Sequence, residues 1–124
     1  MNKVHSVREL EAYKAGFSLQ QEVFRISKTF PKEETYSLTD QVRRSSRAIG
    51  ANLSEAWAKR RYPAHFLSKL TDADGELQET CHWLETAAAC DYVTKQEAEG
   101  LTASAESLGR QLGAMINRYE SFCF

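Results

Sequence analysis

Residues that interrupt helices or cross-link chains are scarce in this sequence. Its 124 residues include only two prolines, Pro31 and Pro63, and three cysteines that share no CxxC spacing. Few prolines permit long helices, because each proline lacks a backbone donor and disfavours helical geometry in the residue before it. An odd number of scattered cysteines does not fit a disulfide framework. We therefore expect reduced thiols and a cytoplasmic protein.

Long apolar runs are missing as well. No run approaches the ~20 residues that cross a bilayer, and the first residues lack the apolar core of a secretory signal. Hydrophobic residues make up 42% of the sequence and charged residues 27%, which is typical of a globular domain rather than a disordered chain. We expect a single domain over residues 1–124 and no membrane partner.

The motifs that usually carry catalysis are also absent. There is no glycine-rich phosphate loop, and the histidines His5, His65 and His82 have no triad-like partners. Glu79 and His82 form one Glu-x-x-His step, whereas a di-metal carboxylate site in a helical bundle needs two such steps and glutamates from two other helices. We predict no enzymatic activity, no metal and no cofactor.

Helical periodicity is what the sequence has in abundance. Apolar residues recur every three or four positions in four segments, at about 9–30, 37–61, 63–90 and 95–120. Long helices joined by short connectors are antiparallel neighbours. The pattern predicts an all-α fold, an antiparallel up-down-up-down four-helix bundle. Capping boxes are predicted at residues 37–40 and 94–97.

The first two helices carry more than one patterned face. In the first, two overlapping apolar stripes are wider than one neighbouring helix needs, so part of this face is free to join another subunit. In the second, a stripe roughly opposite the core consists of Arg44, Ala48, Ala51 and Glu55. We expect this stripe to be a subunit interface, in which Arg44 and Glu55 find partners on another copy. The alternative is an exposed face on which Glu55 pairs with Lys59.

Charge is unevenly distributed although the formal net charge is only −1. Residues 40–69 contain 7 basic and 2 acidic side chains, and residues 70–124 contain 3 basic and 10 acidic ones. A basic surface on the second helix would contact the phosphates of RNA or DNA, or the two halves attract each other within the bundle or between copies. Cations at a helix C-terminus also complement its dipole. The candidate nucleic-acid-binding residues are Arg43, Arg47, Arg60 and Arg61.

Two stretches of the second helix region resemble a known family. Residues 36–46, YSLTDQVRRSS, and residues 49–56, IGANLSEA, are similar to the ribosomal-RNA intervening-sequence proteins, which in turn resemble the accessory variability proteins of diversity-generating retroelements. The resemblance implies a four-helix bundle that assembles as a ring-shaped homopentamer, with no catalytic residues. The retroelement branch further implies nucleic-acid binding through a basic surface, in company with a reverse transcriptase.

Overall fold

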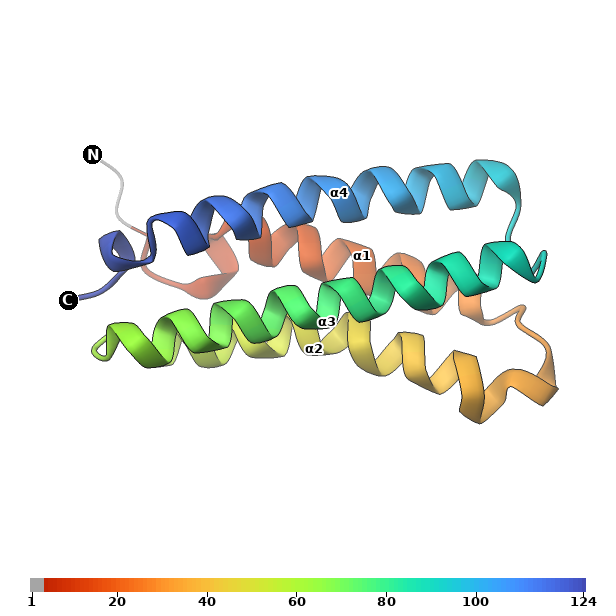
Figure 1. Ribbon diagram of the computed structural model, residues 1–124, viewed down its shortest axis with the longest axis horizontal. Helices are drawn as coiled ribbons and strands as arrows, with labels where there is room; N and C mark the ends of the chain where they lie inside the picture. Colours follow the sequence, from red (N-terminus) through yellow and green to blue (C-terminus); the bar gives the residue numbers. More distant parts are fainter. Residues whose placement is uncertain (1–3) are drawn as a thin grey trace.

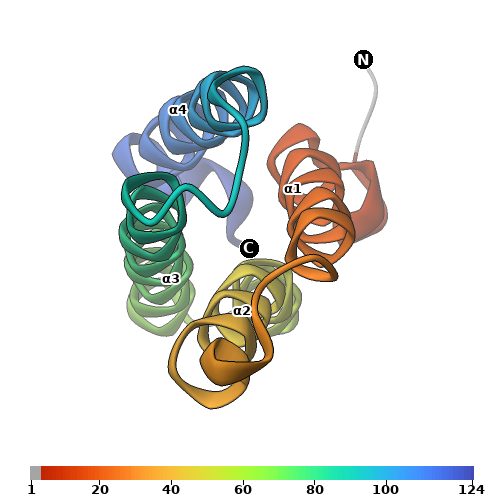
Figure 2. The same cartoon turned by 90° about the vertical axis from the view of Figure 1, so that its right-hand side faces the viewer.

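Four antiparallel helices make up the fold. The computed structural model describes residues 4–124 and contains α1 (Glu11–Ser27), α2 (Asp40–Ala58), α3 (Pro63–Ala89) and α4 (Lys95–Asn117). The helices alternate in direction, and Figure 1 shows both described chain ends at one end of the bundle. Seen end-on in Figure 2, each helix neighbours the next and α4 returns beside α1. No strand occurs among residues 4–124. The predicted all-α four-helix bundle is confirmed.

The helices are shorter than their apolar patterns predict, because tight turns take over at their ends. The first helix was expected to continue to Phe30 but ends at Ser27, where the Ser27 and Thr29 hydroxyls donate to the carbonyls of residues 24 and 26. Such side-chain bonds offer the backbone an alternative to further helix. The last helix ends at Asn117 and is followed by the 3-10 turn Tyr119–Phe122.

One predicted capping box is present and the other is not. The Thr94 hydroxyl accepts from the backbone of Glu97, whose carboxylate accepts from the backbone of Thr94 in return. The box predicted at residues 37–40 is wrong. A π-helical turn, Thr35–Thr39, runs directly into α2, and the Ser37 hydroxyl donates to the Glu34 carboxylate 2.6 Å away. The entry to α2 is therefore continuous with the turn before it.

The core is built from the apolar stripes of all four helices, with one hydroxyl pair inside it. Val23, Ile49, Leu77 and Leu108 illustrate the stripes, and each is at most 1% exposed. The Thr80 hydroxyl of α3 donates to the Ser45 hydroxyl of α2 over 2.9 Å, and both residues are fully buried. Buried polar groups need such partners, so this pair fixes how α2 lies against α3. Within residues 4–124, no helix has the length and hydropathy needed to cross a bilayer.

A glycine sets the close approach of α1 and α2. A Cβ added at Gly16 would lie 3.3 Å from Cγ2 of Ile49, which is tighter than ordinary van der Waals contact. Ile49 is fully buried, so it has little room to move away. Gly16 therefore allows the two helices to pack closely enough for long side chains on their outer surfaces to meet.

Candidate assembly and nucleic-acid surfaces

The stripe Arg44, Ala48, Ala51 and Glu55 lies at the border between α2 and α3. The Arg44 guanidinium pairs with Glu76 at 3.2 Å and also contacts the Glu79 carboxylate. Glu55 accepts from the Lys69 ammonium at 2.7 Å. The partner that Glu55 finds is thus Lys69 on α3 rather than Lys59 in its own helix. Between these two charges, Ala48 is half-buried and Ala51 is exposed.

These ion pairs change the electrostatics of the residues that form them. The hydrogen bond from Lys69 holds the pKa of Glu55 below its usual value. A hydrogen bond from the Trp83 indole, helped by Arg44, lowers the pKa of Glu79 against the opposing effect of burial. The carboxylate of the Glu-x-x-His step is therefore held by Arg44 and Trp83. In the described part of the chain, no group of three potential ligands is placed to hold a metal ion.

Arg43 and Arg47 gather around an aromatic ring of α1. The Arg43 and Arg47 guanidinium carbons lie 4.8 and 5.4 Å from the centroid of the Phe24 ring, and the Lys28 ammonium lies 4.7 Å from it. Arg43 also donates to the Ser27 hydroxyl over 2.8 Å. Cations are attracted to the face of an aromatic ring. We call Phe24, Lys28, Arg43 and Arg47 the Phe24 cluster.

The Phe24 cluster holds three positive charges without a negative one. None of its cations forms an ion pair with any residue among 4–124. Lys28 and Arg47 are exposed and Arg43 is half-buried. Like charges held this close repel one another, so the cluster favours contact with an anionic group. The sequence contained a signal for it that we missed, namely the i,i+4 spacing of Phe24 and Lys28 on the first helix.

Arg60 and Arg61 lie elsewhere, at the far end of α2. The Arg60 guanidinium sits between two rings, 3.7 Å from Trp57 and 5.0 Å from Phe124, and donates to the Trp57 carbonyl. Arg61 is exposed. At 1.5 Å per residue, this end is about 20 Å from Arg47 along the helix. The four arginines predicted as one nucleic-acid surface thus form two separate pairs.

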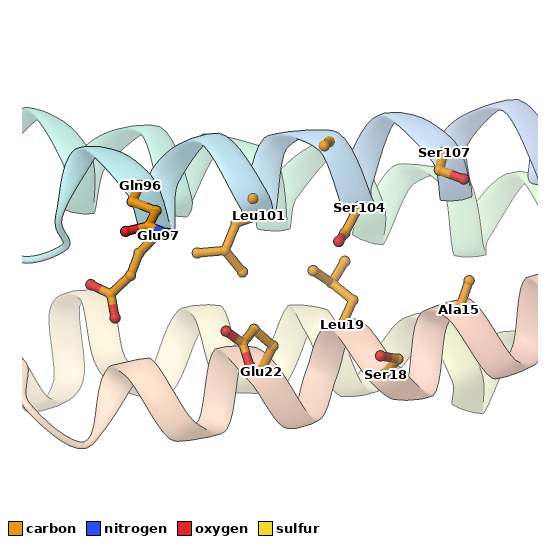
Figure 3. Close-up of a pocket in the computed structure, with 11 residues that line it drawn as sticks. Ala15, Ser18, Leu19, Glu22, Gln96, Glu97, Leu101, Ser104 and Ser107 are labelled. Atoms are coloured by element: carbon orange, nitrogen blue, oxygen red, sulfur yellow. The ribbon is translucent and has the colours of Figure 1, made fainter.

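A groove runs between α1 and α4. Its volume is about 710 Å³, and mainly small or polar side chains line it, with Leu19 and Leu101 between them (Figure 3). Glu22 and Glu97 lie at one end. Arg25 lies beside both, pairing with Glu22 at 2.5 Å and approaching Glu97 to 4.0 Å. The hydrogen bond from Arg25 lowers the pKa of Glu22, so this carboxyl group is not poised to act as a general acid.

Known proteins share this sequence pattern and architecture. A family profile described as 23S rRNA-intervening sequence protein matches residues 8–114. The chain belongs to this family. It is similar to a crystal structure from Bacteroides thetaiotaomicron VPI-5482, a protein of unknown function from the S23 ribosomal protein family. The two are 25% identical with a TM-score of 0.77, over 86% of this chain and 95% of that one. No protein with a curated description matches.

The comparisons confirm the family resemblance of the second helix region. Both stretches that carry it, residues 36–46 and 49–56, lie within the matched range. The structural relative is itself described as having unknown function. The function of this member must therefore be argued from its own surfaces.

Proposed function

We propose that this family member is a non-enzymatic protein that works as a homopentamer, joined through the outward faces of α1 and α2. A row of aromatic side chains on α1 supports the proposal. Tyr13 and Phe17 pack together with their ring centroids 6.3 Å apart, and Phe17 remains 47% exposed. The shallow groove beside them, of about 400 Å³, is lined by Arg8, Tyr13, Lys14, Phe17 and Ser18.

The composition of this surface is that of an interface centre. Aromatic residues and arginine are enriched at the cores of protein interfaces and among the residues that contribute most to binding. Phe17 and the Phe24 cluster follow one another along α1 and combine both types. Full burial of a phenylalanine side chain contributes about 1.5 to 3 kcal/mol relative to leaving it exposed. The exposed part of Phe17 would therefore contribute a useful share of the association energy in each of five contacts.

The proposed interface also includes the stripe of α2 formed by Arg44, Ala48, Ala51 and Glu55. Arg44 directly follows Arg43, so the stripe continues the Phe24 cluster around α2 toward α3. With Arg44 and Glu55 held beside α3, the small side chains of Ala48 and Ala51 leave room for a neighbouring subunit to approach. The proposed contact surface thus runs from Phe17 across the Phe24 cluster to this stripe.

The compartment is also part of the proposal. Cys81, Cys90 and Cys123 are all free thiols, and free thiols persist where the environment is reducing. We place the assembly in the cytoplasm on this ground.

Analytical ultracentrifugation at micromolar concentration tests the assembly. The expected result is one species with five times the 14.1 kDa mass of the chain. Replacing Phe17 with serine should shift the species toward monomer with little loss of helix content, because about half of this ring already faces solvent. As a control, Tyr36→Ser alters a more exposed aromatic outside the proposed surface and should leave the mass unchanged. A monomeric wild-type protein would overturn the proposal.

A second candidate function is nucleic-acid binding as an accessory factor, related to the retroelement proteins. The observation favouring it is the end of α2, where Arg60 and Arg61 lie near two exposed rings. Tyr62 is 57% and Phe124 is 77% exposed. Rings that stack on bases beside cations that meet phosphates are the features of single-strand binding.

Fluorescence anisotropy with structured RNA and with DNA tests this second candidate. Binding through phosphates should weaken steeply as salt rises. The double variant R60A/R61A should abolish binding, and R43A/R47A would locate it in the Phe24 cluster instead. Arg110→Ala, a single exposed arginine on α4, serves as the control. Absence of binding at low salt removes this candidate.

A further inference from the structure

A second groove, between α3 and α4, has an apolar floor and an acidic rim. Its volume is about 260 Å³. Leu84, Leu101 and Ala105 are buried in its floor, and Cys81 is half-buried beside them. Glu85 of α3 and Glu106 of α4 line it from opposite sides and are exposed. It is thus an apolar slot whose two edges carry negative charge.

The two carboxylates that line this groove, Glu85 and Glu106, have no cation of their own among residues 4–124. Burial raises the pKa of the Cys81 thiol, and the charges of Glu85, Glu106 and Asp74 raise it further. Of these carboxylates, Glu85 and Glu106 line the groove beside Cys81. None of them takes part in an ion pair within residues 4–124. The groove therefore carries unbalanced charge of the opposite sign to that of the Phe24 cluster.

We infer that the acidic groove between α3 and α4 receives the Phe24 cluster, with Phe17 beside it, of a second copy of this chain. The inference rests on the proposed homo-oligomer and names the missing half of its contact. Lys28, Arg43 and Arg47 of one copy meet Glu85 and Glu106 of the next, while Phe17 covers the apolar floor. Each surface supplies what the other lacks, which is the charge complementarity that selects and orients partners.

The positions of the two surfaces on the bundle fit this pairing. In Figure 2, α3 and α4 form the left side, whereas α1 lies on the right and α2 below. The outer surface of the α1/α2 pair thus faces away from that of the α3/α4 pair. A contact between two different surfaces is head-to-tail, and it closes into a ring when the rotation between copies allows. A symmetric dimer through either surface alone would instead bring like charges together.

Charge reversal on each surface tests the inference. R43E/R47E leaves a chain with two acidic surfaces, and E85K/E106K leaves a chain with two basic ones. By sedimentation, each variant alone should be monomeric at a concentration at which the wild type is assembled. Mixing the two should restore association between unlike variants, because each then offers the surface that the other lost. Two alternating variants cannot close a ring of five, so the mixed species should be open or even-numbered. The four-fold variant, with both surfaces reversed, should assemble by itself.

Matched controls separate surface pairing from net charge. K59E/R61E and E33K/E120K change the charge by the same amounts at exposed positions outside both surfaces, and both should assemble as the wild type does. Circular dichroism confirms that each variant is folded. If a reversed variant fails to fold, R43Q/R47Q and E85Q/E106Q take its place and should each weaken association at least tenfold.

The outcomes distinguish the inference from the proposal beneath it. A monomeric wild type overturns both. A wild type that assembles while both charge-reversed pairs also assemble overturns the inference and leaves the homo-oligomer standing. Dissociation by R43E/R47E without dissociation by E85K/E106K shows that another surface receives the cluster, which also overturns it. Loss of nucleic-acid binding with intact assembly in R43E/R47E assigns the cluster to phosphate instead and has the same consequence.

Discussion

Long polar side chains account for most of what the sequence did not reveal at the scale of single residues. Arg44 lies on the side of α2 away from the core, which suggested a partner on another subunit, yet its side chain reaches Glu76 and Glu79 on α3. Arg43 likewise crosses to Phe24 and Ser27 on α1. A helical wheel gives the direction of each Cβ, but a flexible arm can lean to either neighbour.

Short side chains are far more predictable, because their contacts lie where their Cβ atoms point. Ser45 shares its helical spacing with the apolar Val42 and Ile49, and the structure buries it completely against Thr80. Ser45 in turn donates to the carbonyl of residue 42, and the Thr80 hydroxyl oxygen lies 2.9 Å from the carbonyl of residue 76. Helical spacing indicates that Ser45 faces the core but does not give its partner, since pairing across helices depends on their register.

The Ser45–Thr80 pair should show strong coupling. Thr80→Val removes one hydroxyl and leaves Ser45 without its donor in a dry core, which should cost about 1 to 3 kcal/mol of unfolding free energy. Ser45→Ala should cost a similar amount. The double variant should lose less than the sum, because no orphaned group remains. Urea denaturation of all four proteins measures this. Strict additivity would show that the hydroxyls do not stabilise each other.

At the scale of elements, the four helices followed from periodicity, whereas their ends did not. Apolar stripes extend past the last helical turn because the turns that follow also bury apolar residues, as Phe30 and Leu38 do. Residues 37–40 have the letters of a capping box, but the preceding Thr35–Thr39 turn already provides the backbone partners that a cap would supply. Local sequence cannot distinguish these two ways of starting a helix.

Two connectors are tied to each other across one end of the bundle. The Tyr92 hydroxyl, after α3, donates to the Glu34 carboxylate, before α2, over 2.8 Å, and the Tyr92 ring packs on Phe30. The bond to Glu34 raises the pKa of Tyr92 to about 12. Hydrogen bonds from Ser37 and Tyr92 lower the pKa of Glu34. This link holds the α1–α2 connector against the α3–α4 connector.

Stability should therefore depend on pH through Tyr92. A folded-state pKa above the unfolded value near 10 gives a contribution that is complete below pH 10 and is lost as pH rises toward about 12. The lowered pKa of Glu34 acts at the other extreme, where its contribution disappears as pH falls below the ordinary carboxyl range. Denaturation from pH 7 to 11 should show the advantage of wild type over Tyr92→Phe shrinking above pH 10. Tyr36→Phe, at an 81% exposed ring, should show no such trend.

At the scale of the whole molecule, charge is separated across the bundle. The excess of basic residues in 40–69 and of acidic residues in 70–124 is visible in the sequence. What the sequence could not show is which of these charges are already matched inside the chain. Arg44, Glu55, Lys69, Glu76 and Glu79 are matched between α2 and α3, and those around Phe24 and Cys81 are left over.

If the charges of the Phe24 cluster and the acidic groove hold the assembly together, thermal stability should depend on protein concentration. When only the folded chain associates, mass action adds to its apparent stability, so the thermal midpoint of the wild type should rise with protein concentration. The R43E/R47E variant should have a midpoint that does not change over the same range. Differential scanning calorimetry across a hundredfold dilution measures both. A concentration-independent wild type would mean that association contributes nothing to folding.

The position of Cys81 makes its chemical reactivity a reporter of self-association. Its thiol sits in the acidic groove with a raised pKa, so little of the reactive thiolate forms at neutral pH. Cys90, by contrast, lies exposed at the end of α3. An alkylating reagent would therefore mark Cys90 first, and a neighbouring copy seated in the groove would hide Cys81 altogether. The ratio of Cys81 to Cys90 alkylation, measured by mass spectrometry, would then report the fraction of the protein that is monomeric.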